Sequence, residues 1–291
     1  MDWEKIDEII KKALEEDIKN GDITTEGIFN NNFFVSADLI CKSKGVLCGL
    51  EVFKRVFTLL SSQFEFNFSF KDGDYIKNKT KIGEIKGPIL ELLKGERTAL
   101  NFLQRLSGIA TETRKFVEKA GKIKIYDTRK TTPNLRILEK YAVKIGGGEN
   151  HRFGLFDMVL IKDNHIKGLM VKEKIDKISA IKFAIRKIKE YTKGNYKIEI
   201  EVENFKEAVS AYEENVDIIM FDNAKISDIK KFCKFKKGKR DCEIEVSGNI
   251  NLKKIEKLKG LDIDRISIGS ITHSPKSIDF SLKIKKCLKT T

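Results

Sequence analysis

The spacing of apolar residues along the first part of the chain changes from element to element. Residues 1–20 carry apolar side chains at helical spacing, from Trp3 to Leu14, and Asn20-Gly21 then marks a helix end. The same reasoning predicts further elements, in chain order: strand 33–41, helix 50–61, strands 64–70, 81–86 and 88–93, and a long helix over 95–120. The first part is therefore predicted to be a mixed domain of helices and strands.

Beyond about residue 120 the pattern becomes regular. Short strands rich in Ile and Val lie in KIKIYDT, DMVLIKD, YKIEIEVEN, VDIIMFDN, CEIEVSGN and DRISIGS, and helical stretches such as 172–193 and 204–215 separate most of them. Strands that alternate with helices indicate βαβ units and a parallel sheet. A doubly wound sheet and an α/β barrel both fit this pattern.

Each of the predicted strands in this second part ends in a charged residue or a small polar loop. In chain order these ends are Asp127-Thr128-Arg129-Lys130, Lys162-Asp163-Asn164, Glu201, Asp222-Asn223, Ser247-Gly248-Asn249 and Gly269-Ser270. In a barrel the carboxyl ends of the strands meet on one rim, where active sites are built. The joint pattern therefore predicts a binding site at this rim.

The rim is expected to hold charged side chains of both signs. Its candidate cations are Arg129, Lys130, Arg152 and Lys162, and its candidate acids are Glu201 and Asp222. Four cations in one pocket repel one another unless an anion fills it, and Arg forks match carboxylate and phosphate edges, each such bond contributing about 1.5–3 kcal/mol. The small loops offer backbone N–H groups to an anion, and carboxylates beside phosphates are the usual setting of Mg²⁺. The rim is predicted to bind a highly anionic ligand.

Two of the three histidines fall in one short stretch, HRFGLFDMVLIKDNH (151–165), which follows a glycine triplet. His151, beside Arg152, is a candidate acid, base or polarising donor, whereas we expect His165 and His273 to orient their loops. The sequence has no GxxxxGK[ST] motif, no GxGxxG motif between a strand and a helix, and no obvious Ser-His-Asp or Cys-His set. Ordinary P-loop, Rossmann and triad chemistry is therefore not favoured.

Composition restricts the class of protein. The chain has 291 residues and is 41% hydrophobic, enough for a large core. It shows neither a signal peptide nor an apolar run long enough for a membrane span, so a cytoplasmic location is expected. Five cysteines without a CxxC motif predict inert thiols rather than disulfides or a zinc site.

The net charge of +14 is compatible with nucleic acid, an anionic membrane surface or an anionic small substrate. Most basic residues are mixed with acids, which is typical of solvated helix faces. The one dense basic run, KKFCKFKKGKR (230–240), is predicted to be a surface helix end and loop. Because the chain lacks a basic arm and basic motifs interleaved with aromatics, a nucleic-acid binder is the less favoured alternative.

The stretch DTRKTTPNLRILEKYAVKIGGGENHRFGLFDMVLIKDNHI (127–166) closely resembles the signature of the quinolinate phosphoribosyltransferase family, the decarboxylating nicotinate-nucleotide pyrophosphorylases. GERTALNFLQRLSGIAT (95–111) is similar to the dimer-helix motif of this family. IEIEVENFKEAV, DIIMFDN, EVSGNI and ISIGSITHS follow in the family's order. The resemblance covers nearly the whole chain. It departs at Asn134 and Asn249, where many members have Gly.

This resemblance implies an α/β fold, with an N-terminal open-faced α/β sandwich and an incomplete, TIM-like α/β barrel. The predicted domains are 1–112, joined by 275–291, and 113–274. The implied reaction joins quinolinate and 5-phosphoribosyl-1-diphosphate in NAD biosynthesis. It gives nicotinate mononucleotide, diphosphate and CO₂, with Mg²⁺ as cofactor. The implied assembly is a homodimer, and further assembly into hexamers is left open.

The resemblance also implies roles for individual residues. Thr128, Arg129, Lys130, His151, Arg152 and Lys162 would surround quinolinate and the phosphates, Glu201 and Asp222 would lie near the ribose and Mg²⁺, Ser247, Gly248, Asn249, Gly269 and Ser270 would hold the 5′-phosphate, and Arg97 would be lent across the dimer. Lys130, Lys162, Glu201 and Asp222 are the implied catalytic residues. Which lysine stabilises the carbanion of the decarboxylation step stays open.

Three alternatives remain beside the nucleic-acid binder. One is a phosphoribosyltransferase that acts on nicotinate, another is the molybdenum-linked paralogue of the same fold, and the third is a catalytically silent scaffold. The cation set, of the size needed for a dicarboxylate, and the intact TRKT and NHR motifs favour quinolinate. All matched charged positions are retained, which argues against the scaffold.

Overall fold

The structure, a computed structural model, describes residues 2–288 and forms two compact units. Unit 1 comprises the described parts of Met1–Lys115, Thr131–Gly147 and Ser270–Thr291, and unit 2 comprises Phe116–Lys130 and Gly148–Gly269. The domain bounds expected from the sequence, 1–112 with 275–291 and 113–274, stay a prediction. Within residues 2–288, no helix has both the length and the apolar character that crossing a membrane requires.

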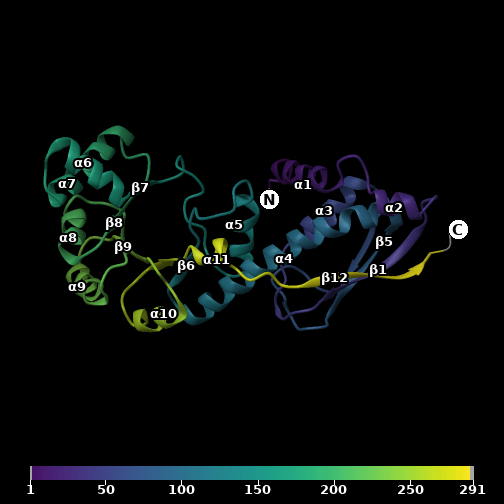
Figure 1. Cartoon of the computed structure of the whole chain (residues 1–291). Coiled ribbons are helices and arrows are strands. Elements are labelled where there is room, and N and C mark those ends of the chain that lie inside the picture. Colours follow the sequence, from purple (N-terminus) through teal and green to yellow (C-terminus); the bar gives the residue numbers. More distant parts are fainter. Residues whose placement is uncertain (1, 289–291) are drawn as a thin grey trace. The chain divides into compact units, whose positions relative to one another are not determined.

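Unit 1 is built on an antiparallel sheet of order β12-β1-β5-β3. Its elements, shown in Figure 1, are α1 (Trp3–Ile18), α2 (Ile23–Ile28), β1 (Phe34–Cys41), β2 (Gly45–Val46), α3 (Leu50–Leu60), β3 (Glu65–Phe68), β4 (Tyr75–Ile76), β5 (Lys81–Pro88), α4 (Ile89–Ala120, whose last residues belong to unit 2), α5 (Arg136–Ile145), α11 (Ser270–His273) and β12 (Phe280–Cys287). The last strand pairs with the first, Leu282 opposite Leu39, so the chain's C-terminal segment completes this sheet.

Most of the elements predicted for this part are confirmed, including the amphipathic first helix. In α1 the Asp2 side chain accepts the Lys5 N–H as an N-cap, and the face that carries Ile6 and Ile10 is buried. The predicted strand 88–93 is wrong, because α4 begins directly after Pro88. A short apolar run such as ILELL fits a helix as well as a strand, and sequence periodicity does not separate the two.

Unit 2 contains a six-stranded parallel sheet of order β6-β11-β10-β9-β8-β7. Its elements are β6 (Lys124–Tyr126), β7 (Val159–Ile161), α6 (Asp163–Glu173), α7 (Lys177–Thr192), β8 (Ile198–Val202), α8 (Phe205–Glu213), β9 (Ile218–Asp222), α9 (Ile226–Lys236), β10 (Glu243–Ser247), α10 (Leu252–Leu258) and β11 (Arg265–Ser267). All six predicted strands are confirmed. The predicted helix 172–193 starts later, at Lys177, because Asp176 caps it and residues 172–173 belong to α6.

The strand order decides between the two predicted architectures. From β7 to β11 each strand lies beside its predecessor in the chain, and β6 closes onto β11, so the order never reverses as it does in a doubly wound sheet. The sheet is open between β6 and β7, and Glu149 forms a parallel bridge with Tyr126 along β6. Unit 2 is therefore the predicted incomplete barrel.

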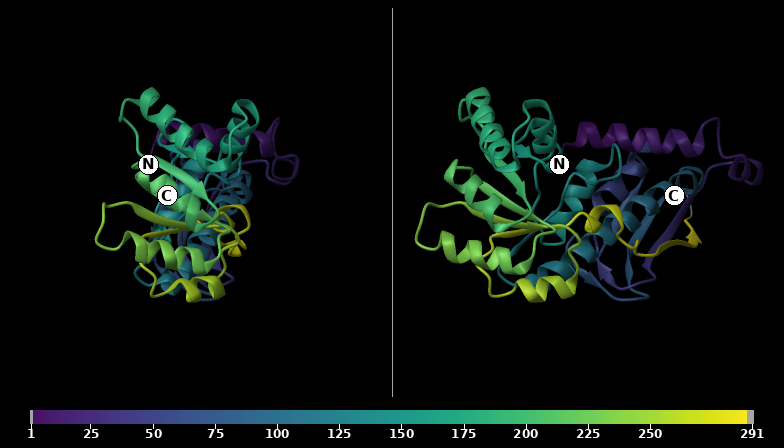
Figure 2. Two further views of the ribbon diagram at one scale, coloured as in Figure 1. Left: turned by 90° about the vertical axis from the view of Figure 1, so that its left-hand side faces the viewer. Right: turned by 60° about the vertical axis from the view of Figure 1, so that its left-hand side comes forward.

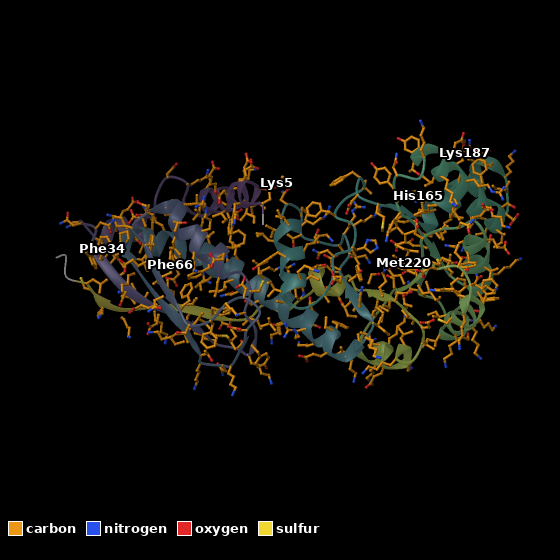
Figure 3. All side chains as sticks on the ribbon, turned by 180° about the vertical axis from the view of Figure 1, so that it is seen from behind. Lys5, Phe34, Phe66, His165, Lys187 and Met220 are labelled. Carbon is orange, nitrogen blue, oxygen red and sulfur yellow. The ribbon has the colours of Figure 1, made fainter. Side chains whose placement is uncertain are left out.

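The two faces of this sheet differ in chemistry. In β8 the isoleucines Ile198 and Ile200 are buried on one face, and the helices α6–α9 lie along one side of the sheet (Figure 2). The alternate residues Glu199 and Glu201 lie on the opposite face, and the ladder pairs Glu201 with Met220 of the next strand. Met220, labelled in Figure 3, is buried. The second face is therefore an enclosed interior that carries charged side chains.

All five cysteines lie within the described residues and are free thiols, so the expected absence of disulfides agrees with this geometry. Four are buried and Cys287 is exposed. Burial raises the pKa of Cys48 well above its ordinary value, which keeps that thiol protonated and unreactive.

Candidate active site

The rim of the unit 2 sheet collects most of the predicted site residues. The strand ladder sets Asp222 directly opposite Ser247, and Tyr126 opposite Ser267, at the carboxyl ends of their strands. Thr128, Arg129, Lys130, His151, Arg152, Lys162, Glu201, Gly248, Asn249 and Gly269 belong to the same unit. Arg97, on α4, and Ser270, the first residue of α11, belong to unit 1. Ser270 follows Gly269 directly in the chain.

Lys162 and Glu201 form an ion pair at this rim. Lys162 follows the last residue of β7, and its Nζ lies 3.3 Å from Glu201 Oε1. The backbone N–H of Asp163 donates to Glu201 Oε2 at 3.3 Å, and the N–H of Lys162 donates to His165 Nδ1 at 2.8 Å. His165 thus orients its own loop, in line with its expected role, and its contact with the Lys162 backbone fixes the residue whose side chain pairs with Glu201.

Arg129 and Arg152 bring two positive charges toward one another. Burial lowers the pKa of Arg152, and the nearby charge of Arg129 lowers it further. Arg152 is 8% exposed; its Nη1 donates to the Met158 carbonyl oxygen at 3.0 Å, and its buried Nε has no hydrogen-bond partner among the described residues. Two like charges beside a buried, unsatisfied donor are suited to bind an anion.

The loop after β10 depends on an unusual backbone. Gly248 and Asn249 have φ angles of +83° and +48°, and a Cβ on Gly248 would collide with the Asn223 side chain. Asn249 Nδ2 donates to Asn223 Oδ1 at 3.0 Å, and Lys254 Nζ donates to the Gly248 carbonyl oxygen at 2.7 Å. Asn134 also has a positive φ, 65°. Both departures from the family pattern therefore keep a left-handed residue, which Asn tolerates almost as Gly does.

A second network, within unit 1, holds the residues that follow Lys130. Arg105 Nη2 lies 2.7 Å from Glu139 Oε1, 3.1 Å from Thr132 Oγ1 and 2.6 Å from the Thr272 carbonyl oxygen. Glu139 is fully buried and also accepts the Thr132 N–H at 3.1 Å. The loop that begins at Thr128 is therefore anchored at Thr132 by a buried carboxylate.

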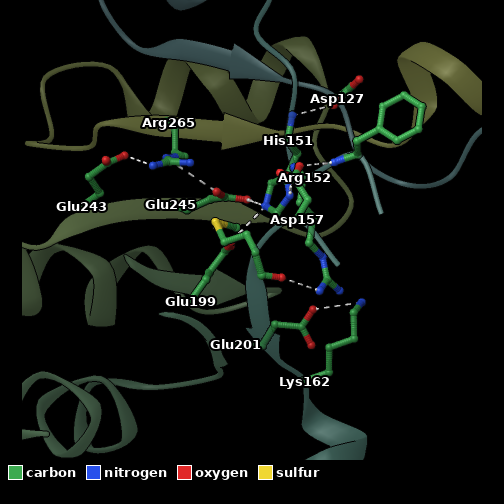
Figure 4. Close-up of polar contacts among 12 residues, drawn as sticks. Asp127, His151, Arg152, Asp157, Lys162, Glu199, Glu201, Glu243, Glu245 and Arg265 are labelled. Atoms are coloured by element: carbon green, nitrogen blue, oxygen red, sulfur yellow. Dashed lines mark hydrogen bonds and ion pairs between the residues drawn. The ribbon is translucent and has the colours of Figure 1, made fainter. Parts of the chain in front are cut away.

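Sequence reasoning missed a buried cluster beneath the rim. Glu199 of β8 and Glu245 of β10 are both 0% exposed, and one side-chain oxygen of each lies within 4.8 Å of a ring nitrogen of His151. Arg265 of β11 approaches Glu245 and pairs with Glu243 (Figure 4). The signal was present: glutamates alternate with isoleucine in strands of a parallel sheet, which is normally apolar on both faces.

The rim also offers oxygen ligands of the kind that Mg²⁺ prefers. Glu201 and Asp222 present carboxylates there, but both Glu201 oxygens already contact Lys162 or the Asp163 N–H, and Asp222 accepts from the Asn223 side chain. Mg²⁺ commonly keeps waters and binds through one or two carboxylates and substrate phosphates. The residues fit an ion that is carried mainly by a phosphate ligand.

Arg97 lines a pocket that lies wholly within unit 1. The pocket has a volume of about 440 Å³, and its lining includes Glu16, Asp17, Asn101 and Arg105. An arginine beside acids in an open pocket is accessible to a second macromolecule or ligand, which is compatible with the lending role that the resemblance implies.

The chain matches known proteins over nearly its full length. Residues 22–107 match the model of the quinolinate phosphoribosyl transferase N-terminal domain, and residues 109–283 match that of its C-terminal domain. It is 40% identical over 281 residues to a probable nicotinate-nucleotide pyrophosphorylase [carboxylating] of Bacillus subtilis, covering 94% of this chain and 93% of that protein. The corresponding protein of Methanocaldococcus jannaschii is 41% identical, covering 95% and 96%. The crystal structure of NadC from Streptococcus pyogenes superposes with a TM-score of 0.92 at 43% identity, covering 99% of both chains.

Proposed function

The chain belongs to the quinolinate phosphoribosyltransferase family, and from this membership we propose how its residues carry out the family's reaction. The enzyme is a decarboxylating phosphoribosyltransferase of NAD biosynthesis. It joins quinolinate and 5-phosphoribosyl-1-diphosphate, and it releases diphosphate and CO₂ as nicotinate mononucleotide forms. We assign these events chiefly to side chains at the rim of unit 2.

The pair of arginines at the rim carries the assignment of quinolinate. Arg152 is buried, its pKa is lowered by burial and by Arg129, and its Nε lacks a partner among the described residues. Quinolinate is a dicarboxylate, and each guanidinium can bind a carboxylate through two parallel hydrogen bonds. Binding of the substrate would relieve the repulsion between the two arginines, whereas a monocarboxylate would relieve only part of it.

The phosphoribosyl transfer then needs no general base from the protein, because the pyridine nitrogen of quinolinate is itself the nucleophile. It attacks C1 of the ribose as the bond to diphosphate breaks, with the electron pair of that bond leaving on the diphosphate. Lys130 and Lys162 supply positive charge close to these oxygens, an electrostatic contribution of the kind that dominates many enzymes. Mg²⁺, when bound, would neutralise charge on the departing diphosphate.

The remaining rim residues hold the sugar phosphate. Glu201 and Asp222 accept hydrogen bonds from ribose hydroxyls in this proposal, and the loop at Gly248-Asn249 and Gly269-Ser270 presents backbone N–H groups to the 5′-phosphate. The support is geometric: Asp222 is paired with Ser247 across the ladder, and Gly248 has the left-handed backbone that such a loop requires. Mg²⁺ would lie near Glu201 and Asp222, held mainly by the diphosphate.

Decarboxylation follows on the adduct that the transfer has made. The bond between C2 and its carboxylate breaks, and the electron pair stays at C2, next to the pyridinium nitrogen that acts as the sink. A proton then replaces CO₂ at C2. A lysine ammonium near this carbon stabilises the developing negative charge, and Lys162 is the favoured candidate because its Nζ is held at the rim by Glu201.

A homodimer with Arg97 lent to the neighbouring site is the assembly that we propose. A chain with Arg97→Ala is mixed with a chain that carries Lys162→Ala, so that a mixed dimer has one site with both residues intact. The proposal predicts recovery of activity after mixing. Subunit exchange with no recovery would contradict it, and light scattering on the wild type separates dimers from hexamers.

The substrate assignment has a direct test. The purified enzyme is given 5-phosphoribosyl-1-diphosphate and Mg²⁺ with either quinolinate or nicotinate, and nicotinate mononucleotide is measured in both. The proposal predicts product from quinolinate. Product from nicotinate alone would overturn the roles given to Arg129 and Arg152.

A further inference from the structure

Two fully buried glutamates of unit 2 have no part in the chemistry described above. Glu199 and Glu245 extend from β8 and β10 on the charged face of the sheet, with β9 between those strands, and both side chains are 0% exposed. Burying carboxylates is unfavourable unless polar groups compensate for the lost water. Their position below the rim therefore requires an explanation.

The ring of His151 lies against both carboxyl groups. Its Nε2 is 3.0 Å from Glu199 Oε2 and 3.7 Å from Glu245 Oε1, and the residue is 7% exposed (Figure 4). Its Nδ1 accepts the backbone N–H of Arg152 at 2.8 Å. Because an accepting nitrogen carries no proton, the proton of the neutral ring is on Nε2, the ring nitrogen that lies near both acids. With both nitrogens occupied by protein groups, the ring is not placed to act as an acid or base on a substrate.

The same hydrogen bond argues against a metal ion in this cluster. Nε2 of His151 and one oxygen from each of Glu199 and Glu245 lie within 4.8 Å of one another, a spacing that could hold a cation. A metal-bound histidine, however, donates its other ring N–H to a neighbouring acceptor. Here Nδ1 faces a donor instead, so binding a metal at Nε2 would require the ring to lose its last proton.

Charged groups on neighbouring elements balance the buried acids. Arg265 Nε, on β11, lies 3.8 Å from Glu245 Oε2, and its guanidinium stacks on Tyr126 at 4.7 Å. Burial raises the pKa of Glu199 to about 8, against the charges of Arg265 and Arg152, and it raises the pKa of Glu245 well above the ordinary value. The pair therefore retains a proton near neutral pH, which avoids two full negative charges in one buried site.

We propose that Glu199 and Glu245 are positioning residues for phosphoribosyl transfer: they fix the His151 ring, and the ring holds the Arg152 backbone so that its guanidinium meets quinolinate. The inference rests on the proposed role of Arg152 in binding this substrate. The His151 N–H donates to Asp127 Oδ1 at 2.7 Å, so the backbone is fixed at both His151 and Arg152. The cluster thus acts through Arg152 rather than on the substrate.

The first experiment measures which nitrogens of the His151 ring carry a proton in the enzyme without substrate. The chain has three histidines, so nitrogen NMR on protein labelled at histidine gives three ring patterns, assigned with His165→Gln and His273→Gln. The proposal predicts a neutral His151 ring with the proton on Nε2. An imidazolium, or a proton on Nδ1, would overturn it. No substrate is present, so this result is independent of whether quinolinate is the correct substrate.

The second experiment measures whether Glu199 works through His151. Glu199→Gln is expected to lower kcat/KM for quinolinate about 10–100-fold, by analogy with the loss found when the outer partners of metal ligands are removed, while KM for 5-phosphoribosyl-1-diphosphate stays within about twofold. In a His151→Ala background the same substitution is expected to change kcat/KM by less than about twofold, because coupled residues are not additive. Glu203→Gln is the matched control, since Glu203 is exposed and paired with Lys177.

The outcomes separate a positioning role from a merely structural one. Losses that multiply in the double variant, or an equal rise of KM for both substrates, would show that Glu199 supports the fold and not Arg152. If Glu199→Gln melts at a much lower temperature than the wild type, the same kinetic measurements are made on Glu245→Gln, alone and combined with His151→Ala. A wild-type enzyme that makes no nicotinate mononucleotide would refute the proposed function, while the NMR result would still decide the arrangement of the ring.

Discussion

Replacing Lys162 by Met separates its part in the reaction from its part in the fold. The Lys162 side chain is 47% exposed and its Nζ is 3.3 Å from Glu201 Oε1, whereas the Glu201 side chain is 14% exposed. Half-exposed ion pairs contribute about 0–1 kcal/mol to stability. Because Glu201 also accepts the Asp163 N–H, the variant keeps one hydrogen bond to that carboxylate. We therefore expect the free energy of unfolding to fall by less than about 1 kcal/mol.

The effect on catalysis should be much larger. A hydrogen bond to a charged group is worth about 1.5–3 kcal/mol, and each 1.36 kcal/mol of lost transition-state stabilisation is a tenfold loss of rate. Removing the ammonium should therefore lower kcat/KM by roughly 10- to 150-fold. If Lys162 stabilises the decarboxylation carbanion, the rate of CO₂ release under saturating substrates should fall by a similar factor.

The assay combines steady-state kinetics with single-turnover release of CO₂, and a denaturant titration measures stability. Lys167→Met is the matched control, because Lys167 forms an exposed pair with Asp163 on the same helix, at 2.8 Å. The control should leave kcat/KM within about twofold of the wild type, as expected for a surface pair. A Lys162→Met enzyme that keeps wild-type kcat/KM and the wild-type rate of CO₂ release would refute the role given to this lysine.

Three further predictions concern the buried Arg105–Glu139 pair, the loop after β10 and the metal ion. Glu139→Gln removes the buried carboxylate that pairs with Arg105. Because the Arg105 side chain is 28% exposed, we expect the lower end of the usual cost, a loss of about 3 kcal/mol in the free energy of unfolding. A loss under about 0.5 kcal/mol would contradict the network. Gly248→Ala should raise KM for 5-phosphoribosyl-1-diphosphate, because the new Cβ would collide with the Asn223 side chain. Gly238→Ala should not raise this KM, because Gly238 also has a positive φ but has no atom within 4 Å of a new Cβ. Equal effects of the two substitutions would argue against a phosphate-binding loop at Gly248. Removing Mg²⁺ with a chelator should abolish turnover reversibly, and full activity in the chelator would contradict the proposed cofactor.

The barrel could be predicted because its signals are local. The strands lie in segments rich in Ile and Val, and helical stretches separate most of them, so the strands of unit 2 were found from their own residues. The polar strand ends also predicted where the rim lies, since parallel strands end on one edge. In contrast, residues 88–93 were assigned to a strand because a short apolar run carries no period that separates strand from helix.

The groups beneath the rim could not be found in the same way. Glu199 and Glu245 resemble solvent-facing residues of a half-exposed strand, and only the closure of the sheet shows that they are buried. The role of His151 depends on those carboxylates and on the Arg152 N–H, which come together only in the folded chain. Likewise, nothing local in the sequence pairs Arg105 with Glu139.

The central claim is that this enzyme transfers a phosphoribosyl group to quinolinate and decarboxylates the adduct. The most direct measurement uses quinolinate labelled in its C2 carboxylate, with 5-phosphoribosyl-1-diphosphate and Mg²⁺, and follows labelled CO₂ and nicotinate mononucleotide together. The account predicts that both form in equal amounts and only when the ribosyl donor is present. Release of CO₂ without the donor, or a nucleotide that keeps the label, would contradict it.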